Sequence, residues 1–348
     1  MKKWMTLLLA ALLVIAFALG ACAEGNTRVF IDSTGREVVL PENMDRIAVT
    51  GPLAQIVVFA IAPDEMIALS NAWNEGAEEY IAEKYMNLPL LGQLYGGKGQ
   101  MNLEELLAAA PQVVIDIGRP VDGIREDMDA LTEQTGIPFV HIAAHTESMD
   151  KTYEMLGELL GKKEQAAALS AYCRSAYDRA KAISESVEKT RMLYMPAITG
   201  LAVIAKGSYH SEAIDMMGDN LAVMENPSSK GTGNEVDMEQ VMIFNPDVVI
   251  FGESGGYEEA MADPLWQAVS AGQTGRIYQA PFGVYNWLGN PPSVQRLLGM
   301  LFMGKLLYPD AADYDMYEEA KTYYDLFYHC ELTQAQYDKM VERSLGKQ

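Results

Sequence analysis

Aromatic and basic side chains gather in the segments that follow the predicted strands. In an open α/β sheet, ligands bind beyond the carboxyl ends of the strands, so these segments are the expected binding loops. They run over residues 50–52, 70–74, 94–100, 118–122, 206–210, 228–233, 253–257 and 282–290. Stacking rings and positive charges suit an anionic ligand with planar rings; solvated loops without a ligand are the alternative. The candidate ligand-binding residues are Trp73, Tyr95, Arg119, Lys206, Tyr209, Tyr257, Tyr285 and Trp287, with Lys98 and Lys230 as further cations.

Two of these loops also hold candidate metal ligands, Tyr285 and His210. A phenolate oxygen is a hard donor that suits Fe(III), whereas an imidazole suits softer metals. The alternative is a structural role, because one histidine beside a tyrosine does not make a ligand set. No intrinsic cofactor is expected, since the sequence has no G-x-x-x-x-G-K-[ST] phosphate loop and no H-E-x-x-H motif.

The elements that must position these loops alternate between strands and helices, which predicts an α/β fold with mostly parallel sheets. The predicted strands cover residues 28–31, 37–40, 46–49, 66–69, 113–116, 138–142, 191–195, 202–205, 248–251 and 276–279. The predicted helices cover residues 53–60, 103–110, 125–135, 211–217, 238–244 and 294–307.

One long helix interrupts this alternation. Residues 162–189 contain neither proline nor glycine, and their apolar positions recur every three or four residues. The pattern predicts one helix of roughly 40 Å, long enough to connect two lobes; two helices with an unmarked kink are the alternative. The tyrosine-rich tail is predicted to form packed helices, and Thr333 is predicted to cap the last of them.

An internal repeat flanks the long helix. Residues 103–115 (LEELLAAAPQVVI) and 238–250 (MEQVMIFNPDVVI) share a glutamate, a proline and a Val-Val-Ile run without gaps, 135 residues apart. Each copy predicts a helix, a proline stop and a buried parallel strand. The repeat therefore indicates two similar lobes.

Composition excludes one class of partner. The chain has 348 residues, with 26 Lys and Arg against 48 Asp and Glu, a formal charge of −22. A chain this acidic has no general attraction for nucleic acid.

The N-terminal segment predicts export. Lys2 and Lys3 precede an apolar run over residues 7–19, which is short for a membrane span. Leu19-Gly20-Ala21-Cys22 then resembles a bacterial lipobox, in which Cys22 is lipidated and becomes the first mature residue. An ordinary secretory signal is the alternative. The two later cysteines, Cys173 and Cys330, are expected to be buried thiols, and a disulfide between them is the alternative.

These features together resemble a known family. The segment 31–49 (IDSTGREVVLPENMDRIAV), the paired Glu-x₆-Pro-x-Val-Val-Ile units and the long helix are similar to the periplasmic binding proteins of ABC importers for ferric siderophores, haem and vitamin B12. The segment 286–309 resembles the iron-compound branch. The resemblance covers nearly the whole mature chain and implies two Rossmann-like α/β lobes, bridged by one long helix, with the ligand cleft between them.

The resemblance also implies how the protein meets its transporter. In the family, one surface glutamate on each lobe contacts arginines of the permease, and the matching residues are Glu104 and Glu239. Paired carboxylates at a fixed separation would set the orientation of docking. Glu105 is an alternative on the first lobe. Both glutamates could instead only stabilise the first turns of their helices.

The expected function is that of a monomeric, lipid-anchored receptor outside the cytoplasm that delivers a ferric chelate to an ABC permease. Cobalamin, haem, a nickel or cobalt chelate, and molybdate or tungstate are the alternative ligands. A surface receptor without transport and a secreted hydrolase are remote alternatives; Ser208 and His210 are two residues apart and do not share a helical face. The expected segments are a signal peptide (1–21), a tether (22–27), a first lobe (28–146), a linker with the long helix (147–190), a second lobe (191–308) and C-terminal helices (309–348).

Overall fold

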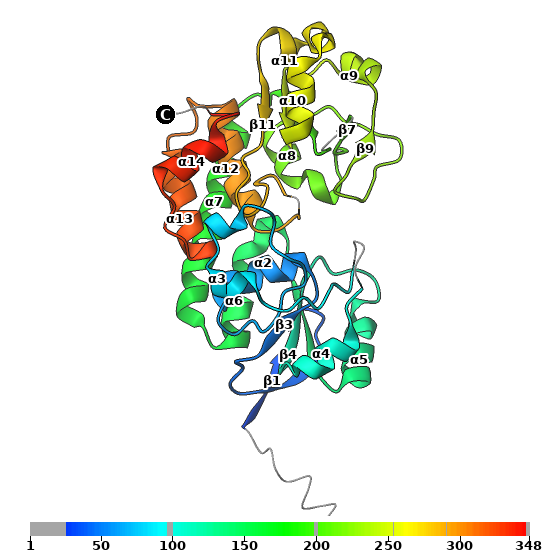
Figure 1. The fold of residues 1–348 in the computed structure, drawn as a ribbon, viewed down its shortest axis with the longest axis vertical. Coiled ribbons are helices and arrows are strands. Elements are labelled where there is room, and N and C mark those ends of the chain that lie inside the picture. The colour runs from blue at the N-terminus through cyan, green and yellow to red at the C-terminus, as the bar shows by residue number, and fades with distance from the viewer. Residues whose placement is uncertain (1–25, 96–99, 198–200, 253, 290, 346–348) are drawn as a thin grey trace, which may run out of the picture.

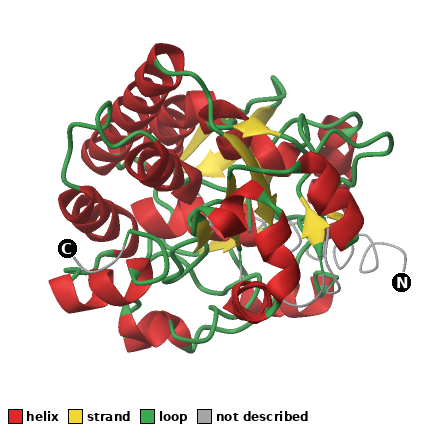
Figure 2. Cartoon of the chain, turned by 90° about the horizontal axis from the view of Figure 1, so that it is seen from above, coloured by secondary structure: helices red, strands yellow, loops and turns green. Residues whose placement is uncertain are grey.

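The computed structural model describes residues 26–95, 100–197, 201–252, 254–289 and 291–345. The expected signal peptide, Cys22 and most of the tether lie outside these ranges, as do Lys98 and Glu253. Figure 1 shows two α/β lobes stacked along the long axis, with helices running beside both of them. In the view from above, helices surround strands that lie in the interior (Figure 2).

The N-terminal lobe is built on a parallel sheet of order β3-β4-β5. The hydrophobic strands β3 (Ile47–Val49), β4 (Val113–Gly118) and β5 (Phe139–Ala143) are almost entirely buried, as parallel strands covered on both faces must be. Helices α2 (Pro52–Ile61), α4 (Leu103–Ala109) and α5 (Ile124–Thr135) belong to this lobe. The hairpin of β1 (Thr27–Ile31) and β2 (Glu37–Pro41) precedes it.

One predicted strand of this lobe is wrong. Residues 66–69 form only two isolated bridges, Ile47 to Met66 and Leu69 to Leu90, because the segment meets a different neighbour at each end. A short 3-10 helix, η1 (Ala77–Glu79), and α3 (Glu83–Met86) follow it.

The C-terminal lobe holds a second parallel sheet of order β11-β10-β6-β8. Its strands are β6 (Arg191–Met195), β8 (Asp219–Asn220), β10 (Val248–Phe251) and β11 (Ile277–Gln279). The predicted strand at 202–205 is shorter and pairs antiparallel, as β7 (Ala202–Val203) with β9 (Asn234–Glu235). The helices are α8 (Glu212–Met217), α9 (Met238–Phe244), α10 (Ser254–Ala262), α11 (Ser270–Gln273) and α12 (Gln295–Leu307).

Within the segment 253–257, which was expected to be a loop, residues 254–257 form the start of helix α10. The glycines in this segment argue against a helix at the level of sequence, because glycine is a poor helix former. At Gly256 the reason for glycine is close packing, because a Cβ atom would lie 2.8 Å from the carbonyl oxygen of Ala197.

Helix α7 (Lys163–Ser186) confirms the single long helix. Its 24 residues span about 36 Å and run without interruption. It packs against α2 and α6 (Met149–Leu160) of the N-terminal half and against α8 and α12 of the C-terminal half, so it connects both lobes.

The tail forms α13 (Met316–Tyr328) and α14 (Gln334–Val341). The tyrosines of α13 are packing residues, as expected: Tyr323, Tyr324 and Tyr328 are buried, and the Tyr323 ring stacks on Phe327. Thr333 forms a capping box with Gln336 at the start of α14. Cys173 is buried and Cys330 is partly buried, and both are free thiols. Within the described ranges, no helix is long and apolar enough to cross a bilayer.

Candidate ligand-binding cleft

A cavity of about 230 Å³ lies at the carboxyl ends of β3 and β4. This is where ligands bind in open α/β sheets. The first turn of α2 borders it; the helix starts at Gly51 and Pro52 without a side-chain cap, so its partially positive end faces the cavity wall. The lining residues are Thr50, Gly51, Pro52, Leu53, Ala54, Tyr95, Asp116, Ile117, Gly118, Arg119, Val121 and Ile124.

A second cavity, of about 350 Å³, is lined by both lobes. Arg119 forms part of the wall of both cavities, so the two spaces meet at this side chain. The N-terminal lobe contributes His145, Thr146 and Glu147 besides Arg119, the long helix contributes Tyr177, and the C-terminal half contributes Gly207, Ser208, Glu212, Asp215, Met216 and Met300. The expected cleft between the lobes is therefore present, and Arg119 forms part of the walls of both its cavities.

Tyr209 contacts two arginines at this junction. The guanidinium carbons of Arg119 and Arg296 are 4.5 Å and 4.8 Å from the centroid of its ring. Burial raises the pKa of the Tyr209 phenol, and the charge of Arg296 partly opposes that rise. The phenol donates a hydrogen bond to the carbonyl oxygen of Pro292 over 3.2 Å. The ring thus holds both arginines in place through cation–π contacts.

A buried carboxylate forms part of the first cavity. Asp116 accepts a hydrogen bond from the hydroxyl of Thr50, and its other oxygen lies 2.6 Å from Nδ1 of His141. Both Asp116 and His141 are buried. Asp116 was not predicted as a site residue, although a carboxylate in the otherwise apolar run VVIDIG is a usable signal.

Two other predicted residues lie near the cleft. Tyr95 is exposed on the cavity wall, and its phenol donates to Asp127 over 3.1 Å. Lys206 lies beside the cleft residue Gly207, but its amine is held 2.9 Å from Asp219.

Three predicted aromatic residues are not in the cleft. Trp73, Tyr285 and Trp287 are buried in the hydrophobic core, so the expectation that their rings face the ligand is wrong. The Trp73 ring packs 4.9 Å from Phe59, and its indole N–H donates to the carbonyl of Tyr85. Large apolar rings are stabilised most by full burial, and Tyr285 and Trp287 follow that rule rather than lining the cleft.

Tyr257 also turns away from the cleft. It belongs to α10, and its ring lies 5.3 Å from the guanidinium carbon of Arg343, which follows α14. Its predicted role in ligand binding is replaced by a contact between α10 and the tail.

The two candidate metal ligands have other surroundings. Burial raises the pKa of Tyr285, which opposes the phenolate form that iron would need. Burial, followed by the charge of Arg296, lowers the pKa of His210, whose ring hydrogen-bonds backbone groups of Ser229 and Gly289. Among the described residues, neither belongs to a cluster of His, Cys, Asp or Glu with the arrangement of a metal site.

The expectation that the chain has no G-x-S-x-G motif is wrong, because the segment GESGG at residues 252–256 matches this pattern of hydrolase nucleophile turns. Such a serine needs a histidine base oriented by an acid. The histidine–carboxylate pair recorded in the described part of the chain is His141 with Asp116, and it joins β4 and β5 in the other lobe.

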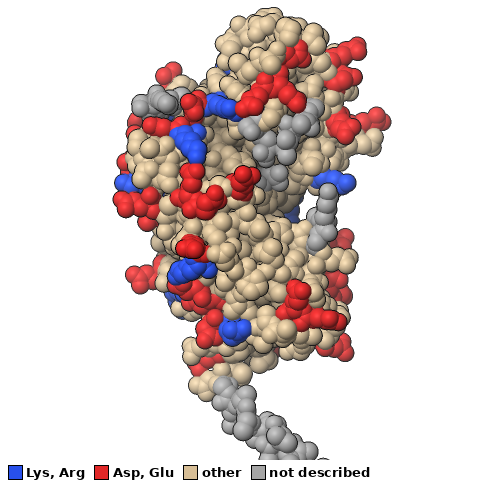
Figure 3. All heavy atoms as spheres, viewed as in Figure 1, with Lys and Arg blue, Asp and Glu red and all other residues tan. Residues whose placement is uncertain are grey.

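Glu104 and Glu239 are exposed in the first turns of α4 and α9. Asn102 caps α4 and Asp237 caps α9, so neither glutamate is needed as the capping residue. The two helices belong to different lobes and lie toward the same edge of the molecule in Figure 1. Acidic side chains are spread over both lobes on the face shown in Figure 3.

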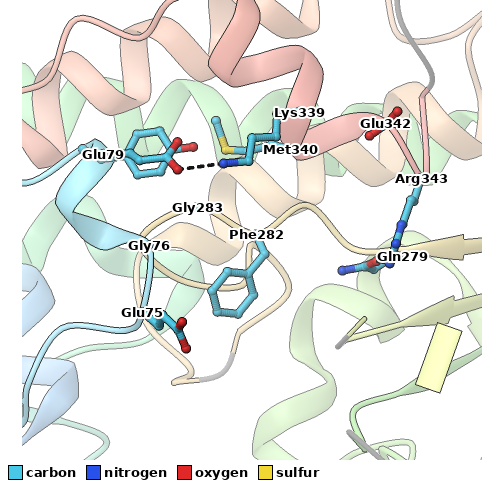
Figure 4. Close-up of a pocket in the computed structure, with 11 residues that line it drawn as sticks. Glu75, Gly76, Glu79, Gln279, Phe282, Gly283, Lys339, Met340, Glu342 and Arg343 are labelled. Carbon is cyan, nitrogen blue, oxygen red and sulfur yellow. Dashed lines mark hydrogen bonds and ion pairs between the residues drawn. The ribbon is translucent and has the colours of Figure 1, made fainter. Parts of the chain in front are cut away.

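A groove of about 330 Å³ between η1, the segment 279–283 and α14 is a third concave site. Figure 4 shows Phe282 beside this groove and Lys339 paired with Glu79, at 2.7 Å. Arg343 is bonded to Gln279 and to Glu258. These pairs join the tail to η1 in the N-terminal lobe and to β11 and α10 in the C-terminal lobe.

Comparison with known proteins identifies the family. The model of the Periplasmic binding protein family matches residues 61–283, more than half of the chain. The chain belongs to this family. Its members are substrate-binding proteins of ABC transporters rather than enzymes, and they work outside the cytoplasm.

Solved structures agree with this assignment. This periplasmic binding protein is 26% identical to an ABC transporter solute-binding protein from Sulfurospirillum deleyianum, with a TM-score of 0.82 over 90% of this chain and 99% of that one. A periplasmic solute-binding protein from Veillonella parvula is 27% identical, with a TM-score of 0.74 over 91% and 98%. The molybdate-binding protein MolA of Haemophilus influenzae, at 19% identity and a TM-score of 0.69 over 88% and 99%, shares the fold. No curated protein matches the chain in sequence.

Proposed function

We propose that this periplasmic binding protein captures an anionic metal chelate in the cleft between its lobes, with a ferric siderophore as the first candidate. The observation that carries the proposal is the position of Arg119, which forms part of the wall of both cavities in a chain of net charge −22. A fixed guanidinium in a cleft favours a ligand with anionic oxygens.

The surroundings of Arg119 support the same ligand charge. The positive end of α2 borders the first cavity, and Tyr209 holds a second guanidinium, that of Arg296, close to the first. Tyr95 is the predicted aromatic residue whose exposed ring remains for stacking against the chelate.

Two solved proteins that share this fold have described ligands of this kind. The Haemophilus influenzae protein is described as molybdate-bound, and VctP of Vibrio cholerae as a catecholate-siderophore binding protein. Oxyanions and catecholates share the oxygen-rich negative charge that Arg119 would bind. The ligands chosen for the binding test must therefore include both classes.

Delivery completes the proposed function. Cys22 would hold the protein to the membrane through a lipid, and Glu104 and Glu239 would contact arginines of an ABC permease. Their exposure on separate lobes supports this role, since docking would then depend on the spacing of the lobes.

The test is isothermal titration of the mature protein with iron(III) complexes of catecholate and hydroxamate chelators, haem, cobalamin, a nickel chelate and molybdate. Tryptophan fluorescence is less suitable, because Trp73 and Trp287 are buried away from the cleft. We expect one iron chelate to bind, and R119A to weaken that binding about 10- to 100-fold. The matched control is R125A, since Arg125 donates to Thr34 on the surface outside both cavities. Binding of cobalamin alone, or equal losses in both variants, would contradict the proposal.

A further inference from the structure

The carboxylate of Glu212 collects hydrogen-bond donors from both lobes. Arg119, which follows β4, donates to Oε1 of Glu212. Thr146, which follows β5, donates its hydroxyl to Oε2 over 2.5 Å. Arg296 of α12 donates to the same oxygen over 2.9 Å. Two neighbouring oxygens of one group thus satisfy three donors at the centre of the cleft.

One donor, Arg296, is more deeply buried than the acceptor, whereas the side chain of Arg119 is 43% exposed. The side chain of Arg296 is 1% exposed, whereas that of Glu212 is 21% exposed and forms part of the second cavity wall. Arg296 also donates to the carbonyl of Tyr209 over 2.6 Å, and the ring of Tyr209 supports both guanidinium groups. If the Glu212 carboxylate moved out, these contacts would keep Arg296 and Tyr209 in place.

We propose that this cluster is an oxyanion subsite, in which the carboxylate of Glu212 occupies the position that a two-oxygen group of the solute takes. Carboxylate, catecholate and hydroxamate groups each offer a pair of neighbouring oxygens to Arg119, Thr146 and Arg296. The identification of the solute as a metal chelate rests on the function proposed above. The existence of the subsite rests on the three donors alone.

Glu212 then acts as an internal competitor. A side chain tethered beside its own site has a high effective concentration, so a dissolved anion must outcompete it. Solutes with a single weak acceptor fail to do so. A chelate that adds further contacts with Tyr95 and the first cavity succeeds, which makes Glu212 a residue that determines specificity.

The first test asks whether the subsite binds a dissolved carboxylate. In E212A the donors lose their acceptor, and acetate is small enough to replace it. We expect acetate at about 0.1 M to raise the Tm of E212A by a few degrees relative to chloride at equal ionic strength. Wild type should not respond, because its own carboxylate fills the subsite. E147A is the matched control, since Glu147 is an exposed glutamate that forms part of the same cavity wall.

The second test asks whether the solute uses the subsite. We expect E212A to bind the iron(III) catecholate complex at least about tenfold more tightly than wild type and E147A. If E212A does not fold, E212Q, which keeps the side-chain volume, is used to measure the change in chelate affinity. Absence of any acetate effect, or unchanged chelate affinity in both Glu212 variants, would overturn the subsite. Acetate stabilisation without binding of any chelate by any variant would leave the subsite standing and refute the proposed function.

Discussion

Two ion pairs in the C-terminal half have the same length and very different surroundings. Arg296 to Glu212 and Lys206 to Asp219 both measure 2.9 Å. The side chains of the first pair are 1% and 21% exposed, and those of the second are 46% and 42% exposed. Removing the cation from each pair therefore compares the loss of a buried pair with the loss of an exposed one.

We expect R296M to cost far more stability than K206M. Breaking a buried pair costs about 3–5 kcal/mol, because the remaining charge loses its partner in a medium of low polarity. Glu212 is partly solvated and keeps Arg119 and Thr146, so the loss should fall near 3 kcal/mol, the lower end of that range. The exposed Lys206 pair is worth about 0–1 kcal/mol.

Urea unfolding followed by far-ultraviolet circular dichroism measures both losses. The midpoints should separate clearly, with K206M near wild type, and the difference should persist at high salt because a buried pair is screened little. A loss below 1 kcal/mol for R296M, or equal losses in the two variants, would refute the argument that burial decides the strength of these pairs.

Three further predictions concern pH, docking and anchoring. Burial acts to raise the pKa of Asp32, but hydrogen bonds from Thr34 and from the backbone outweigh it and hold the pKa below the ordinary value of 3.8. The ionised carboxylate thus stabilises the fold above that value, and this stabilisation is lost as pH falls through the lowered pKa. Urea unfolding between pH 3 and pH 7 should show the fall in stability in wild type, and a smaller fall in D32N. Replacing both Glu104 and Glu239 by arginine should abolish uptake in cells while binding in solution is unchanged; normal uptake would remove the docking role. C22A should move the protein from the membrane fraction to the soluble fraction, and its retention on membranes would contradict lipidation.

Local patterns in the sequence predict most of the fold. The uninterrupted periodicity of 162–189 corresponds to α7, and the repeated unit at 103–115 and 238–250 corresponds to α4–β4 and α9–β10. These elements are determined by apolar spacing and stop residues within a few turns of chain. The failures at 66–69 and 254–257 occur where pairing or close packing with distant residues decides the conformation.

The site was predicted less completely, because loop position does not reveal which way a side chain points. Arg119 and Tyr209 were found, whereas Trp73 and Trp287 proved to be core residues. Arg296 was missed, although an arginine in the apolar helix QRLLGMLFMGKLL was a visible signal. Its partner Glu212 comes from a distant segment, and nothing in the spacing joins the two.

The most direct test of the account is to locate the metal in the complex. Crystals of the mature protein with an iron(III) catecholate complex, measured at the iron absorption edge, give the iron position without assumptions about the ligand. The account predicts one anomalous peak in the cleft, beside Tyr95, Arg119 and Tyr209. A peak in the groove beside α14, or an occupied cleft with Arg119 turned away from the chelate, would contradict it.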